Sequence, residues 1–481
     1  MLDAAALAGF RPGTTRTAVS AGRGAALDVP GQVLRLTGYG YGSTERLASS
    51  LLPLLLAPEV MEQMDLLEPG EAAERVQDVV DRILTRQSGN GSFGQWSAGG
   101  FDVWLDAYVT EALLLAEAHG ANVPAVAMRM ALDNLRNNLA RAGSMRDGAA
   151  GYAYAFHVLA QAGEAAIGDL RYHADVLAER FDTPLAAAHL GAALAVYGER
   201  GRAEVMFAQA ERLALAESED LGWRADYGTK LRDRAALLAL ATGAGSTAVD
   251  LGRLSTLVSS ALTDRYRSTQ EAAWLLRAAV AMGTEASMLE VNGQPLEGGV
   301  LAPSEGESLE FTNVGTVPVT LTVTTFGVPE TPPAAGGVGY SITRTLFTPD
   351  GEPADLSAIR AGDRLVTVLE VRPERGVPGG LLLIDDPLPA GFEIDNANLL
   401  RAGDVRSLDW LDVQGSADMT EARADRFVAA LRWTSQEPLR LAYFVRAVSP
   451  GEFHHPAPLV EDAYRPTNRA VGETGRLVIR P

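Results

Sequence analysis

The sequence predicts a multidomain α plus β protein, in which an α/α toroid of helical hairpins is followed by antiparallel β-sandwich domains. Residues 29–285 are rich in Ala, Leu, Arg and Glu, with apolar residues at helical spacing. After residue 286, Thr, Val, Gly and Pro increase and an alternation of period two appears. The chain has 481 residues, which is too long for one ordinary hydrophobic core.

The helical part shows apolar stripes separated by Gly and Pro breaks. Val76, Val79, Val80, Ile83 and Leu84 form one such stripe. The breaks predict roughly ten to twelve helices of about 10 to 18 residues with short connections. Trp104 and Trp274 each follow a polar turn and are expected to start an Ala/Leu helix. Small residues allow the close approach that a closed ring needs, although an open helical solenoid would leave a similar pattern.

The β part shows short alternating segments between turn signals. Val317, Val319, Leu321 and Val323 alternate with polar residues and Pro, and residues 365–371 and 439–448 are expected to form further strands. Asn292-Gly293 and Asp350-Gly351 are typical of tight turns. Residues 1–28 are not a domain of their own, and residues 15–19 are expected to add one strand to the β part.

Composition excludes several classes of function. The net charge of −20 argues against nucleic acid and anionic membrane as partners, and no run approaches the roughly 18 apolar residues of a membrane span. The absence of cysteine excludes disulfides, thiolate metal sites and cysteine nucleophiles. The six histidines show no metal-binding spacing, so we expect neither a metal nor a cofactor. Met1 opens no signal peptide, so if the mature protein is exported, its export signal is expected to lie elsewhere.

The most informative stretch is Tyr39-Gly40-Tyr41-Gly42-Ser43-Thr44-Glu45-Arg46. It resembles the thioester motif of bacterial alpha-2-macroglobulins, a Tyr-Pro-Tyr-Gly run followed by Cys-x-Glu-Gln, and the resemblance implies a bond between the Cys sulfur and the Gln acyl group. Here Ser43 stands at the Cys position and Arg46 at the Gln position. A guanidinium has no acyl carbon, so this bond cannot form.

The remaining frame of the motif suggests structural roles. We expect Ser43 to cap a helix that starts near Thr44, because serine suits that position. Ser43 is a poor candidate for a hydrolase nucleophile, since no Gly follows two residues later as in a nucleophile elbow. Gly40 and Gly42 are expected to allow close approach of a neighbouring β-sandwich, with Tyr39 and Tyr41 as buried contacts. We expect no catalytic residue.

Further segments resemble the same family over nearly the whole chain. Residues 87–96 look like its Gly-rich turn, and residues 391–394, 442–451 and 460–466 resemble its terminal macroglobulin-like domain. The resemblance implies an N-terminal segment with one CUB strand at 1–28, a toroid of the thioester-domain type at 29–285, a CUB-like segment at 286–330 and a β-sandwich at 331–481. It also makes Tyr443 and Tyr464 candidates for aromatic contacts between domains, with ordinary packing as the alternative.

The resemblance implies the C-terminal part of a non-enzymatic protease trap that lacks covalent capture. Proteases would be the partners of the full-length protein, in the periplasm or cell envelope. One alternative is a periplasmic scaffold that binds envelope proteins and has no inhibitor activity. Another is a toroid enzyme, which would need an acidic pocket in the ring. Terpenoid cyclases share the toroid, but Asp102 and Asp106 do not reproduce their aspartate-rich motif.

Overall fold

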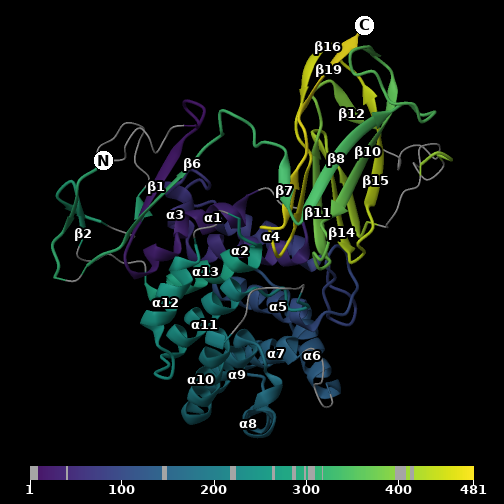
Figure 1. Cartoon of the computed structure of the whole chain (residues 1–481). Helices are drawn as coiled ribbons and strands as arrows, with labels where there is room; N and C mark the ends of the chain where they lie inside the picture. Colours follow the sequence, from purple (N-terminus) through teal and green to yellow (C-terminus); the bar gives the residue numbers. More distant parts are fainter. Residues whose placement is uncertain are drawn as a thin grey trace. The chain divides into compact units, whose positions relative to one another are not determined.

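The computed structural model describes residues 9–38, 42–142, 149–216, 224–262, 266–283, 289–296, 300–301, 309–316, 318–395, 408–411 and 417–481. The chain divides into two compact units (Figure 1), which are described separately below. The first unit holds the helices and two small sheets, and the second holds the strands from Pro332 onwards together with the short segment Tyr266–Ser268. Within the described residues, no helix is both long and apolar enough to cross a membrane.

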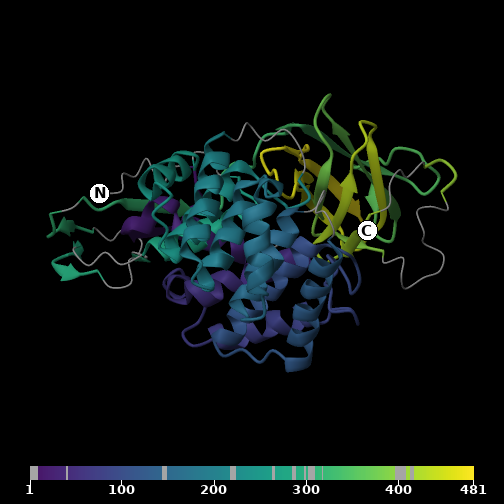
Figure 2. The same cartoon turned by 90° about the horizontal axis from the view of Figure 1, so that it is seen from below.

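Thirteen α-helices occupy the first unit within the described residues (Figures 1 and 2). They are α1 Val29–Thr37, α2 Thr44–Leu56, α3 Pro58–Gln63, α4 Ala72–Leu84, α5 Val103–Ala118, α6 Ala125–Arg141, α7 Ala149–Gln161, α8 Ile167–Val176, α9 Pro184–Val196, α10 Arg200–Ala216, α11 Lys230–Ala244, α12 Leu251–Ser260 and α13 Thr269–Met282. Arg23–Leu27 and Ala178–Arg180 form short 3₁₀ helices.

Six of these helices form a closed inner ring. Helix α2 packs on α5, α5 on α7, α7 on α9, α9 on α11, α11 on α13, and α13 returns to α2. Helices α1, α4, α6, α10 and other outer helices pack against the outside of neighbouring inner ones. The return of α13 to α2 distinguishes the toroid from the open solenoid that the sequence left possible.

Burial and capping explain why these segments form inner helices. Helix α9 is buried nearly all round, whereas the outer helix α4 buries only Val76, Val80 and Ile83. Side-chain oxygens cap several inner helices at their first turn. These caps are Ser43 for α2, Asp102 for α5, Thr183 for α9 and Thr229 for α11.

The helical ring is an insertion between β segments. The strands of the first unit are β1 Arg16–Ala21, β2 Leu289–Val291, β3 Gln294–Pro295, β4 Val300–Leu301, β5 Phe311–Asn313 and β6 Leu321–Phe326. Strand β1 precedes all of the α-helices in the sequence and pairs antiparallel with β6, which follows them. Val19 lies opposite Val323 in this pair. The expected strand near residues 15–19 is therefore present. Asn292 and Gly293 both have positive φ in the turn from β2 to β3, as the sequence indicates.

The second unit is a sandwich of two antiparallel sheets with a third small sheet beside them. Its strands are β7 Gly336–Val338, β8 Tyr340–Phe347, β9 Ile359–Arg360, β10 Arg364–Pro373, β11 Gly380–Pro387, β12 Phe392–Ile394, β13 Met419–Ala422, β14 Arg426–Trp433, β15 Leu439–Ala447, β16 Gly451–His455, β17 Leu459–Asp462, β18 Arg469–Val471 and β19 Gly475–Arg480. The sheet orders are β12-β15-β10-β8, β13-β14-β11-β17-β18-β7 and β16-β19-β9.

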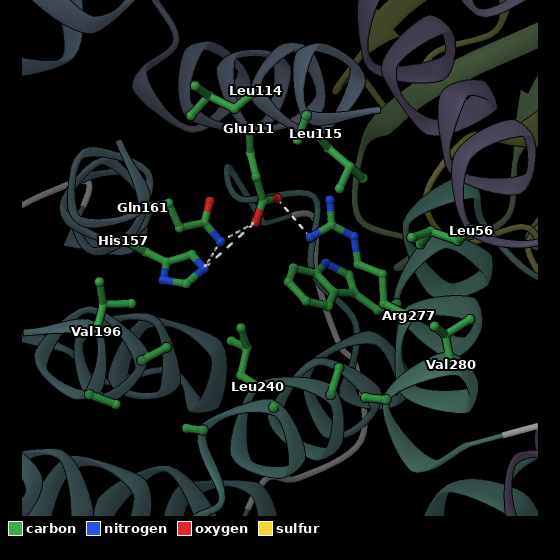
Figure 3. Close-up of a pocket in the computed structure, with 18 of the residues that line it drawn as sticks. Leu56, Glu111, Leu114, Leu115, His157, Gln161, Val196, Leu240, Arg277 and Val280 are labelled. Atoms are coloured by element: carbon green, nitrogen blue, oxygen red, sulfur yellow. Dashed lines mark hydrogen bonds and ion pairs between the residues drawn. The ribbon is translucent and has the colours of Figure 1, made fainter. Parts of the chain in front are cut away.

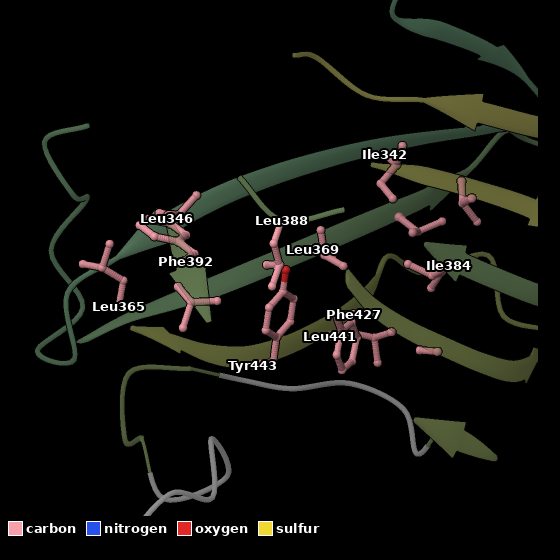
Figure 4. Close-up of a cluster of buried hydrophobic side chains, with 14 of the residues drawn as sticks. Ile342, Leu346, Leu365, Leu369, Ile384, Leu388, Phe392, Phe427, Leu441 and Tyr443 are labelled. Atoms are coloured by element: carbon pink, nitrogen blue, oxygen red, sulfur yellow. The ribbon is translucent and has the colours of Figure 1, made fainter. Parts of the chain in front are cut away.

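The sandwich core lies between the two large sheets (Figure 4). Alternate residues of β10 point into it, namely Leu365, Leu369 and Val371, while Val366 and Val368 pack on the other face with Phe444. Residues that alternate along β10 therefore pack on two opposite apolar faces of the sheet. The predicted strand 365–371 lies within β10, and the predicted strand 439–448 corresponds to β15, which ends one residue earlier at Ala447.

Candidate functional site

Ser43 caps helix α2, as predicted. Its backbone is extended, with φ −62° and ψ 154°, and its Oγ accepts a hydrogen bond from the Arg46 backbone N–H at 3.2 Å. The cap satisfies one of the N–H groups that lack partners at a helix start. Among the described residues, no hydrogen bond joins Ser43 to a histidine, lysine or carboxylate that could activate it.

Thr44 ties the start of α2 to the Gly-rich turn. Its backbone N–H donates to the Gln95 carbonyl at 2.8 Å, and its hydroxyl donates to the Gly94 carbonyl. The Thr44 hydroxyl also accepts from Arg86 Nη1 at 3.1 Å. Burial, and secondly the Arg82 cation, lowers the pKa of Arg86. The two motifs that were recognised separately in the sequence are therefore one local structure.

Glu45 closes the helical ring. Its side chain is buried, and its carboxylate accepts from Ser49 Oγ at 2.8 Å, from Gln270 Nε2 at 2.6 Å and from Thr269 Oγ1 at 2.8 and 2.9 Å. Thr269 is the first residue of α13, so the carboxylate lies at the positive end of that helix. Since α13 and α2 are the last and first inner helices, this contact joins the two ends of the ring.

Arg46 points away from this carboxylate. Neighbouring helical residues differ by about 100° in direction, and Arg46 Nη2 donates to the Gly38 carbonyl at 2.8 Å. The remaining frame residues Tyr39, Gly40 and Tyr41 lie outside the described residues.

Within the described residues, the surroundings of Gly42 leave room for a small side chain. A Cβ added there would meet the Arg82 and Arg86 guanidinium groups at 3.5 and 3.6 Å, which is ordinary van der Waals contact. The expectation that Gly40 and Gly42 allow close approach of a neighbouring β-sandwich stays a prediction.

Tyr443 and Tyr464, the candidate interface aromatics, are both buried. The Tyr443 ring stacks on Phe427 with centroids 4.3 Å apart, and its hydroxyl donates to Asp386 Oδ2 at 2.7 Å. Its ring and hydroxyl are thus both engaged inside the sandwich (Figure 4). The Tyr464 backbone N–H donates to Asp462 Oδ1. A contact of either ring with another domain stays a prediction.

The ring interior holds a polar cluster that the sequence interpretation missed (Figure 3). Glu111 Oε2 pairs with Arg277 Nη1 at 2.7 Å and accepts from the Tyr154 hydroxyl at 2.5 Å, and Glu111 Oε1 lies 3.6 Å from His157 Nε2. Burial pushes the pKa of Glu111 up, but Arg277 and His157 outweigh it and hold the pKa well below its usual range. The sequence signal that could have identified this cluster is the presence of charged residues within otherwise apolar helices.

This chain is similar to alpha-2-macroglobulins along nearly all of its length. A model of the bacterial alpha-2-macroglobulin MG10 domain matches residues 339–467. Alpha-2-macroglobulin of Escherichia coli (strain K12) is 31% identical over 490 residues, which cover 95% of this chain and 29% of that protein. The Xylella fastidiosa (strain Temecula1 / ATCC 700964) protein is 29% identical over 493 residues, covering 92% of this chain and 29% of that protein. The chain thus spans under a third of these curated relatives.

Solved structures agree with this similarity. The crystal structure of native E. coli alpha-2-macroglobulin from domain MG7 to the C-terminus has a TM-score of 0.85 and 27% identity, over 100% of this chain and 80% of that chain. Salmonella alpha-2-macroglobulin reacted with methylamine has a TM-score of 0.84 and 30% identity, over 99% of this chain and 32% of that chain. Both matches span the helical ring and the sandwich.

Proposed function

The chain belongs to the bacterial alpha-2-macroglobulin family, and we propose that its full-length protein inhibits proteases by enclosing them without covalent capture. Within this proposal the present residues form the C-terminal part of the trap, which acts as a binding and switching unit and not as an enzyme. Proteases are the proposed partners, and the proposed location is the periplasm or cell envelope.

One observation carries the proposal: the motif keeps its structural residues and lacks its reactive ones. The 481 residues include no cysteine, and position 46 holds an arginine that has no acyl group. Ser43 caps α2, and Glu45 joins α2 to α13. The bonds of the motif that hold the ring together are thus independent of a thioester. Inhibition would then rest on enclosure and non-covalent contact.

A size-dependent protection assay tests this function. The full-length protein is mixed with a broad-specificity protease, and hydrolysis of a small peptide substrate is compared with cleavage of a large protein substrate. We expect small-peptide hydrolysis to persist while cleavage of the large substrate falls at least tenfold, because an enclosing trap excludes only large molecules. Prior treatment with methylamine serves as the control, and we expect it to change neither rate.

Equal cleavage of both substrates would contradict trapping. Combined with recovery of an envelope protein by the same full-length protein, that result would favour the scaffold function. Fractionation of the producing cells tests the proposed compartment separately.

A further inference from the structure

The six inner helices enclose a cavity of about 860 Å³. Its mouth is formed by the last turns of these helices, at Ala118, Val196, Ala244 and Ala281, and its floor lies near Glu111 and the buried Trp274. All lining residues belong to the first unit. The volume is within the range of small-molecule sites, about 300 to 1,000 Å³.

The wall of the cavity is aliphatic (Figure 3). Side chains from five inner helices face the space, namely Leu56, Leu114, Leu115, Val196, Leu240 and Val280. Val196 is 55% exposed, so an apolar surface continues to the mouth. Such a wall favours an apolar molecule, because the molecule removes this surface from water.

Two side chains at the floor hold buried hydrogen-bond donors that have no acceptor among the described residues. Trp274 is 1% exposed, and its Nε1 has no hydrogen-bond partner among the described residues. Arg277 Nη1 pairs with Glu111, but its Nε and Nη2 have no partner within the same described part of the chain. Both groups donate and cannot accept. Burying donors without partners is unfavourable, so an acceptor at this floor would stabilise the ring.

The Arg277 donors lie just beneath the lining surface. The Arg277 side chain is 13% exposed, and its guanidinium carbon lies 4.8 Å from the centre of the Trp274 ring. Because Nε and Nη2 are buried beneath this surface, the Arg277 side chain must rotate before they can donate to an acceptor in the cavity.

The charges around the cavity indicate whether the hydrogen-bond acceptor of a bound molecule is anionic or neutral. Glu111 already neutralises Arg277 at 2.7 Å, and the rim carries one residue of each sign, Glu117 and Arg200. An anionic head would add an uncompensated buried charge, and a cationic head would face the N–H groups. A neutral carbonyl oxygen avoids both costs.

We propose that the ring cavity binds a small neutral amphiphile, whose apolar body lies on the aliphatic wall and whose carbonyl oxygen accepts from Trp274 and Arg277. Acyl amides and esters are the ligand class that fits this arrangement. Because Glu111 is held charged by its ion pair with Arg277, the site binds such a molecule without transferring a proton to it.

Titration calorimetry of the 481-residue chain with octanamide, octanoate and octylamine tests the proposal. These probes share a chain length and differ in head charge. We expect octanamide to bind at least tenfold more tightly than either charged probe. Tighter binding of octanoate or octylamine, or no binding of octanamide, would overturn the proposal.

Two variants locate the site. Leu240→Trp fills the cavity from its half-buried wall and is expected to weaken octanamide binding at least tenfold, whereas Val126→Trp, on an exposed position of outer helix α6, is the matched control and should bind normally. Trp274→Phe removes the indole N–H and is expected to weaken octanamide about threefold to tenfold while a hydrocarbon probe, toluene, binds unchanged. Melting curves establish that each variant is folded. Unchanged octanamide binding by folded Leu240→Trp would contradict the assignment.

Discussion

At the scale of single residues, the side chains of Ser43 and Glu45 hold the start of helix α2 in place. Ser43 Oγ accepts from the Arg46 N–H, and Glu45 accepts from Ser49, Thr269 and Gln270. These bonds depend on the oxygen atoms of the two side chains and not on a thioester.

Removing the cap should cost stability. We expect Ser43→Ala to lower the free energy of unfolding by about 1 kcal/mol, since the Arg46 N–H loses its acceptor. Urea unfolding of the helical unit measures the change. Ser43→Asp, which keeps a side-chain acceptor, is the control and should stay close to the wild type. Equal stability of the alanine and wild-type proteins would show that the cap contributes nothing.

His455 should make the stability of the sandwich depend on pH. Burial, then the Arg344 and His454 charges, lowers the pKa of His455 from 6.5 to about 3. The folded state thus holds the neutral ring while the unfolded state takes up a proton. The neutral His455 ring therefore contributes its full stabilisation above pH 6.5, and this stabilisation is lost as pH falls from there towards 3, by about 1.4 kcal/mol per pH unit. The stability difference between wild type and His455→Gln, measured across this range, should follow that slope. A difference independent of pH would exclude this role.

At the scale of elements, the Gly-rich turn depends on specific glycines. Gly91 has φ +89°, and an added Cβ would lie 2.0 Å from the Met130 carbonyl oxygen. Gly89, two residues earlier, has nothing within 4 Å of an added Cβ. We expect Gly91→Ala to destabilise the helical unit by about 2 kcal/mol or more and Gly89→Ala by less than about 0.5 kcal/mol. Similar unfolding midpoints for the two variants would contradict this explanation of the turn.

Among the contacts between inner helices, we expect the contact between α2 and α13 to be the one whose loss lowers the unfolding free energy most. Glu45→Ala leaves the donors of Ser49, Thr269 and Gln270 without this acceptor, so we expect a loss of about 2 to 4 kcal/mol in unfolding free energy. Glu117→Ala, at an exposed position of α5, is the control and should change stability little. Hydrogen exchange should also show faster opening of α13 in Glu45→Ala, and unchanged exchange would count against ring closure through this side chain.

Helices and strands could be predicted from the sequence where patterns among neighbouring residues are enough to determine them. Apolar spacing and Gly or Pro breaks indicated the helices, and period-two alternation indicated β10 and β15. The start of α13 was not predictable, because Thr269, Gln270 and Glu271 look like a polar turn, whereas the helix begins at Thr269, five residues before Trp274, with all three buried. Their polarity is satisfied by partners from distant helices, including Glu45.

The ring cluster was unpredictable for the same reason. Glu111, His157 and Arg277 come from α5, α7 and α13, and only closure of the ring brings them together. The cap at Ser43 was predictable because it involves residues within one turn. Single-sequence patterns thus reached contacts along the chain but not those between distant helices.

At the scale of the whole molecule, the chain consists of two units with separate cores. The sandwich core runs from Tyr340 to Ile479, entirely within the second unit. We therefore expect residues 332–481 expressed alone to fold, with β-type circular dichroism and a single cooperative melting transition. A fragment without a cooperative transition would show that this core does not suffice.

The central claim is that the full-length protein holds proteases without a covalent bond. Its most direct test is the mass of the protease after trapping, measured on denaturing gels and by intact-mass spectrometry. We expect the protease to co-migrate with the full-length protein under native conditions and to return to its own mass on denaturation, with and without reducing agent. A protease that stays joined to this protein under denaturing conditions would contradict the account.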